Sequence, residues 1–169
     1  MTDPRIARYQ EAGARGARFT LGFQQPDGGY LWEGYPPDAF HKQSYSWAIA
    51  GEIEGAQRLL SWVKAQRLLP DGQLRDYHGD IYKHALLFQG AHRLGRFDLT
   101  YPMARFLLSC QAPCGGFPHL AGEPYCRALA GCQAGIGLLY IGSSTRRRGP
   151  ASGPSASWSS PTPGASTTG

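Results

Sequence analysis

The densest group of chemically capable side chains in this sequence lies in residues 76–84 (DYHGDIYKH). Within it, His78, Asp80 and Tyr82 could exchange protons with a bound substrate, because imidazole, carboxyl and phenol groups all serve in general acid–base catalysis. A second interpretation is that Asp76 and Asp80 cap a helix and that the remaining residues form a solvated loop. The sequence therefore predicts His78, Asp80 and Tyr82 as candidate catalytic residues, with helix capping as the competing explanation.

Basic and aromatic residues near two expected helix starts form a second candidate group. His41 and Lys42 precede Tyr45 in one segment, and Lys83 and His84 open another. Two basic pairs at comparable positions could attract an anionic group at the mouth of a cavity, and aromatic faces could stabilise a cation inside it. Exposed helix ends and ordinary core packing are the alternative. The predicted cavity-lining residues are Tyr45, Trp47, His84 and Phe88.

The cysteines do not form a recognisable metal-binding pattern. Cys110, Cys114, Cys126 and Cys132 lie late in the chain, with His119 among them, and their spacings match no common zinc motif. We therefore expect free thiols, no metal site and no cofactor.

A repeated motif gives the strongest indication of the fold. The pattern A-R-F-x-L-x-x-Q-x-P-x-G-G-aromatic occurs at residues 17–30 and again at residues 104–117, a displacement of 87 residues. A looser copy lies at residues 66–74. The steps from Gly28 to Gly72 and from Gly72 to Gly115 are 44 and 43 residues. A fixed period of this length is typical of repeat architectures.

The elements that carry this motif are predicted to be helices. Apolar spacing predicts one helix from Asp3 to before Pro26, two helices within residues 43–66 that meet near Gly55, and further helices beginning near Asp80 and near Asp98. Residues 125–141 form a last apolar segment, and no stretch alternates with period two. The sequence predicts an all-α chain of helical hairpins, with a tight Gly-Gly turn after each outer helix. Gln24 and Gln111, at the ends of outer helices, can hydrogen-bond free backbone carbonyls of their own and the next repeat.

Residues 24–30 (QQPDGGY) and 111–117 (QAPCGGF) resemble the prenyltransferase and squalene-oxidase repeat of the terpenoid cyclase and protein prenyltransferase superfamily. The resemblance covers residues 5–141 and implies part of an α/α toroid whose inner helices line an apolar cavity. A complete toroid of this family has about six hairpins, and this chain has room for about three. Squalene-hopene-type cyclases carry an acidic D-x-D-D motif at an inner helix, and only Asp80 matches it here.

The resemblance leaves more than one function open. The favoured expectation is a partial array that is not catalytic and that self-associates through its open edge, with Trp47, Leu86 and Phe88 lining a groove there. The alternative is an enzyme acting on an isoprenoid or other apolar small molecule. A weaker alternative is a fragment of a sugar-active α/α barrel, with carboxylates such as Glu33, Asp38, Asp76 and Asp80 as candidates.

The last 28 residues differ sharply in composition from the rest. Residues 142–169 contain no Leu, Ile, Val, Phe, Asp, Glu or Lys, so we expect a disordered low-complexity tail after a repeat domain at residues 1–141. GC-rich coding DNA read out of frame gives such mixtures, so we expect a frameshift after residue 141 that cuts the repeat array short. A genuine disordered tail is the competing explanation.

Charge and hydrophobicity restrict the partners and the compartment. The net charge of +5 falls to +2 for residues 1–141, because Arg146–Arg148 lie in the tail. With no basic helix, nucleic acid is not an expected partner. The sequence shows neither a signal-peptide pattern nor an apolar run long enough to span a bilayer, so we expect a cytoplasmic protein.

Overall fold

A computed structural model of the chain describes residues 3–31 and 39–146. Helices dominate these residues, and their pairings outside helices are isolated β-bridges without a named strand. The prediction of an all-α chain is therefore confirmed. The α-helices are α1 (Pro4–Leu21), α2 (Gln43–Ala50), α3 (Ile53–Gln66), α4 (Ile81–Arg93), α5 (Phe97–Ser109) and α6 (Ala128–Arg146), and short 3-10 helices lie at Ala39–Lys42 (η1) and Arg75–Tyr77 (η2).

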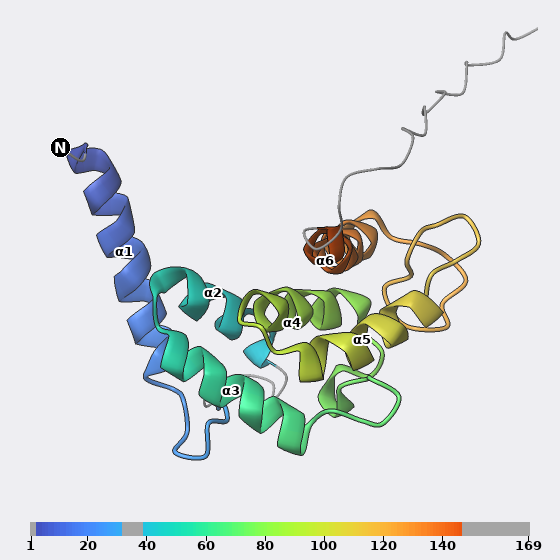
Figure 1. Ribbon diagram of the computed structural model, residues 1–169, viewed down its shortest axis with the longest axis horizontal. Helices are drawn as coiled ribbons and strands as arrows, with labels where there is room; N and C mark the ends of the chain where they lie inside the picture. The colour runs from blue at the N-terminus through green and yellow to red at the C-terminus, as the bar shows by residue number, and fades with distance from the viewer. Residues whose placement is uncertain (1–2, 32–38, 147–169) are drawn as a thin grey trace, which may run out of the picture.

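The helices pack in two layers (Figure 1). An inner row consists of α2, α4 and α6, in which α4 contacts both α2 and α6. An outer row consists of α1 and α3, which pack on α2, and α5, which packs on α4. The N-terminal half of α1 extends away from the other helices (Figure 1), and most of its side chains are exposed. The structure shows a curved helical array, and the predicted membership of a toroid stays a prediction.

Local signals explain where the helices begin and end. The Asp3 carboxylate accepts the Arg5 backbone N–H at 2.8 Å and caps α1, in which Pro4 is the first residue. The break within residues 43–66 lies at Gly51, not near Gly55 as expected. Gly51 has φ +87°, a left-handed conformation that ends α2 and that glycine adopts without strain. Gly55 instead lies inside α3, where the Leu21 side chain packs against it.

Three loops share one backbone geometry. In the first, the Gln25 N–H donates to the Gly29 carbonyl at 2.8 Å, and the Gly28 N–H donates to the Gln25 carbonyl at 2.9 Å. Residues 69–73 repeat these two hydrogen bonds at 2.8 and 3.0 Å, and residues 112–116 repeat them at 2.9 and 2.8 Å. In each loop one glycine has φ between 84° and 92°: Gly28, Gly72 and Gly115. The sequence motif therefore corresponds to one recurring turn after α1, α3 and α5.

Two of these loops pack on the next outer helix, and the third does not. A Cβ atom at Gly28 would lie 2.7 Å from the Arg58 carbonyl oxygen of α3. At Gly72 it would overlap the Pro102 carbonyl of α5. At Gly115 no atom of the described residues lies within 4 Å of such a Cβ. The first two loops thus require glycine for both conformation and close approach, whereas no outer helix of the described residues lies against the Gly115 loop.

The glutamine that ends each motif helix connects neighbouring units. Gln24 Nε2 donates to the Gly28 carbonyl of its own loop at 3.1 Å and to the Gly55 carbonyl of α3 at 2.9 Å. Gln111 Nε2 makes the first of these contacts, to the Gly115 carbonyl at 2.9 Å. The prediction that these side chains bind backbone carbonyls is confirmed, and for Gln24 the bond reaches the next unit.

Helix α6 crosses the boundary predicted between the repeat domain and the tail. Helix α6 continues to Arg146, five residues past the predicted domain boundary at residue 141. Residues 147–169, which make up most of the predicted disordered tail, lie outside the described residues.

Candidate functional site

The acidic residues of the predicted catalytic cluster act in helix capping and ion pairing. The Asp80 carboxylate accepts the Lys83 backbone N–H at 3.0 Å and caps α4, and its second oxygen lies 3.9 Å from Lys83 Nζ. Asp76 pairs with Arg67 at 3.1 Å, and the Arg67 guanidinium stacks on Trp62, 4.6 Å from the ring centre. The capping interpretation accounts for these contacts without a substrate.

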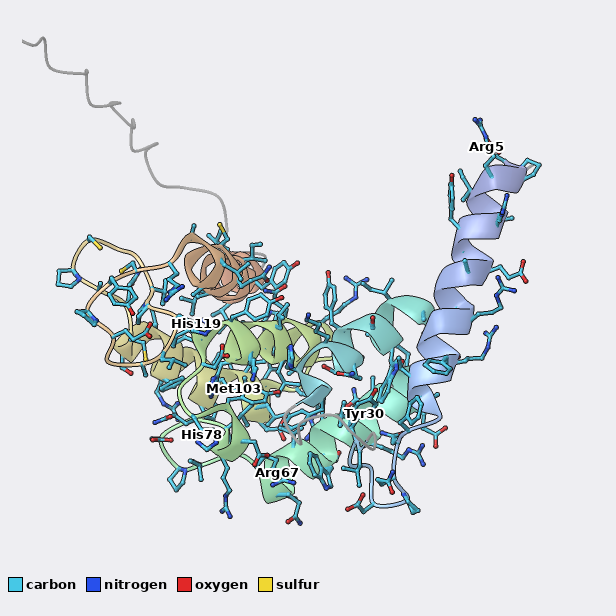
Figure 2. All side chains as sticks on the ribbon, turned by 180° about the vertical axis from the view of Figure 1, so that it is seen from behind. Arg5, Tyr30, Arg67, His78, Met103 and His119 are labelled. Atoms are coloured by element: carbon cyan, nitrogen blue, oxygen red, sulfur yellow. The ribbon has the colours of Figure 1, made fainter. Side chains whose placement is uncertain are left out.

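His78 and Tyr82 lie on the surface side of the same segment. His78 is exposed in the loop that leads into α4 (Figure 2), with a left-handed backbone at φ +47°. Tyr82 is half-buried, with its ring 6.3 Å from that of His41 and 5.7 Å from Lys42 Nζ. The structure therefore separates the predicted catalytic set: Asp80 is buried at the helix cap, whereas His78 faces solvent.

His84 is a buried connector between α4 and the second loop. Its Nε2 accepts the Leu74 backbone N–H at 2.9 Å, and its Nδ1 lies 2.6 Å from the Asp80 carbonyl oxygen. Because Nε2 accepts, Nδ1 carries the proton and donates it to that carbonyl. Burial lowers the pKa of His84 to about 4, since desolvation disfavours the charged imidazole. Both ring nitrogens are thus occupied by backbone groups.

The other predicted cavity residues are distributed between the core and a small cleft. Trp47 is fully buried, and its Nε1 donates to Thr20 Oγ1 at 2.9 Å. Phe88 is also fully buried and packs against Gly137 of α6. These two residues therefore do not line an open groove, which corrects that expectation: helices α1 and α6 cover them. Tyr45 lies at a cleft of about 150 Å³ that it shares with three residues of α4 and α6: His92, Arg93 and Tyr140.

A larger groove, of about 840 Å³, lies between α1 and α2. The residues of α1 that line it are mostly small, and no described residue of its lining carries a carboxylate, imidazole or amine side chain. Its lining consists of Tyr9, Gln10, Gly13, Ala14, Gly16, Ala17, Thr20, Ser46, Ile49 and Ala50. Such a surface can bind an apolar side chain or helix, but it lacks the acid that an alkene-protonating enzyme needs. The apolar positions of α1 predict packing along the whole helix, so the sequence does not reveal this groove.

Two further findings concern membrane insertion and a sugar-active site. Within residues 3–31 and 39–146, no helix is both long and apolar enough to cross a membrane.

Glu33 and Asp38, two of the carboxylates considered for a sugar-active site, lie outside the described residues. The other two carboxylates have structural partners: Asp76 pairs with Arg67, and Asp80 caps α4.

Comparison with protein-family models, with curated proteins and with solved structures finds no match for this chain. Its function is therefore inferred from the residues and their geometry.

Proposed function

We propose that this chain is a non-catalytic helical array of the terpenoid cyclase and prenyltransferase type, which assembles with further copies of itself through its two ends. The proposal rests on the loop at Gly115, against which no outer helix of the described residues packs. The equivalent loops at Gly28 and Gly72 each lie on a following outer helix, whereas no described residue occupies that position under Gly115. The Gly115 loop is thus a third site for an outer helix, and the two equivalent sites are occupied by α3 and α5 of the same chain.

Helix α1 of a second copy has the properties of the missing outer helix. The packing positions on α3 and α5 are Arg58 and Pro102, which are 44 residues apart. The residue 44 positions before Arg58 is Ala14 in α1. Ala14 borders the open groove between α1 and α2, so this side of the helix is accessible to a partner. A second copy therefore supplies an outer helix of the same type.

The inner row ends in an apolar helix face that a second copy would cover. Helix α6 packs on α4 through the side that contains buried Ala130 and Ala134. Its outward side carries four exposed residues at helical spacing: Leu129, Cys132, Ile136 and Leu139. Leu139 is 72 % exposed. In the proposed assembly this face meets the α1–α2 groove of the next copy, so that its α2 extends the inner row.

Replacing Ile136 with aspartate should abolish or weaken this association. A buried interfacial isoleucine contributes about 2 kcal/mol, so the dissociation constant should rise by about thirtyfold or more. Light scattering coupled to size-exclusion chromatography over a range of concentrations measures the mass. The wild-type chain should exceed its monomer mass of 18.4 kDa, and the variant should approach it.

Ile53→Asp is the matched control. Ile53 is 46 % exposed, close to the 41 % of Ile136, but it lies at the start of α3 and belongs neither to α6 nor to the described residues that line the α1–α2 groove. The control should associate like the wild type. A wild-type chain that stays monomeric at all concentrations, or equal weakening by both substitutions, would contradict the proposal.

The non-catalytic part of the proposal has its own test. Asp80 caps α4, and the described residues that line the groove include no acid, so we expect no cyclisation of squalene or oxidosqualene. Incubation followed by gas chromatography and mass spectrometry checks this. Cyclised product that disappears in Asp80→Asn would refute a non-catalytic array.

A further inference from the structure

Two thiols lie side by side at the exposed end of the array. Cys114 belongs to the third loop, and Cys126 belongs to the segment that leads into α6. Their Sγ atoms are 3.9 Å apart, and both residues are exposed. The other cysteines differ: Cys110 is half-buried, and Cys132 is exposed on α6. A disulfide has an S–S distance of about 2.05 Å, so a small movement of one side chain would join Cys114 and Cys126.

Backbone pairing holds together the two segments of the chain that carry the cysteines. Pro118 and Cys126 form an isolated antiparallel bridge, and the Arg127 N–H donates to the Phe117 carbonyl at 2.8 Å. Gly116 makes room for the sulfur, because a Cβ atom there would lie 2.7 Å from Cys126 Sγ. The approach of the thiols is therefore a consequence of this loop's fold and not of two freely moving side chains.

The position of Cys114 is suited to an anion. The equivalent residues in the other loops are Asp27 and Asp71, and each carboxylate accepts the backbone N–H two residues later at 2.9 Å. In the third loop the Gly116 backbone group acts on Cys114 in the same way and lowers the pKa of its thiol. The backbone donor that stabilises a carboxylate in the first two loops thus favours the thiolate of Cys114 in the third. The thiolate is the reactive form of cysteine.

We propose that Cys114 and Cys126 form a reversible disulfide that locks the third loop to the entry of α6. With glutathione disulfide as the oxidant, the Cys114 thiolate attacks one sulfur of the oxidant and releases one glutathione thiolate, which takes up a proton. Cys126, as its thiolate, then attacks Cys114 Sγ of the mixed disulfide and releases the second glutathione. Two protein thiols are oxidised and one glutathione disulfide is reduced to two glutathione thiols.

The test uses the full chain, reduced, freed of reductant and exposed to glutathione disulfide. Free thiols are then blocked with iodoacetamide, and intact and peptide masses are measured. The wild type should lose two hydrogens without retaining glutathione, and one crosslinked peptide pair should contain Cys114 and Cys126. The crosslink closes a short loop and should raise the melting temperature by about 5 °C.

Single substitutions separate this reaction from general thiol oxidation. In Cys126→Ser, Cys114 should retain bound glutathione, because the resolving thiol is absent. In Cys132→Ser, which removes an exposed cysteine outside the pair, the crosslink should form as in the wild type. The crosslink should also form about tenfold faster in the folded chain than in urea, because the fold holds the two sulfurs together. Crosslinks between other cysteine pairs, independent modification of all four thiols, or equal rates in urea would overturn the proposal. This inference rests on contacts within one chain and does not depend on the proposed self-association.

Discussion

Gly72→Ala is expected to be the most destabilising glycine-to-alanine change within residues 3–31 and 39–146. Gly72 has φ +91°, and a Cβ atom there would overlap the Pro102 carbonyl of α5. The left-handed backbone alone costs about 1–2 kcal/mol for alanine. The overlap is with backbone of a packed helix, which cannot rotate away, so the total loss should be about 3 kcal/mol or more. Urea or thermal unfolding followed by circular dichroism measures it.

Gly115→Ala is the matched control for this prediction. Gly115 occupies the same place in the third loop, with φ +84°, but a Cβ atom there meets nothing within 4 Å in the described residues. Only the conformational cost of about 1–2 kcal/mol should remain. Equal losses in the two variants would show that the second loop does not pack tightly on α5. In an assembled sample, Gly115→Ala should additionally weaken association, so the comparison is best made at low concentration.

Acid should destabilise the fold through His84. The pKa of His84 is lowered to about 4 in the folded chain by burial, against about 6.5 in the unfolded chain. Between these values the unfolded state binds more protons, so the free energy of unfolding rises with pH. The stabilisation is complete above pH about 6.5 and is lost as the pH falls to about 4, a change of about 3 kcal/mol. Burial also lowers the pKa of His92, which adds in the same direction.

His84→Gln separates this contribution from that of other groups. A glutamine oxygen can still accept a backbone N–H, but it does not titrate in this range. The variant should be less stable than the wild type at pH 7, and its stability should change much less between pH 6.5 and 4. An unchanged slope in His84→Gln would contradict the assignment of His84 as a buried neutral connector.

Residues close in sequence specify the helices and the loops between them. Asp3 and Pro4 define the start of α1 locally, and the glycines of the repeated motif permit the positive φ that each turn requires. Periodicity and spacing reveal such features. The same reasoning misplaces the break between α2 and α3, because the sequence alone does not show which of Gly51 and Gly55 ends a helix. Only the surrounding structure distinguishes a helix-ending glycine from one that gives space to Leu21.

The roles of the polar residues and the location of the open surfaces depend on the tertiary structure. By spacing, His84 belongs to a basic pair at a cavity mouth, but its partner is Leu74 of the preceding loop, ten residues away. Cys114 and Cys126 are twelve residues apart and become neighbours only through the pairing of their segments. Whether a group titrates, reacts or stays neutral depends on burial and on partners from other elements, and local sequence patterns do not contain those distances. For the same reason, the repeat predicts three equivalent loops, but only their packing shows that, within the described residues, no outer helix lies against the third.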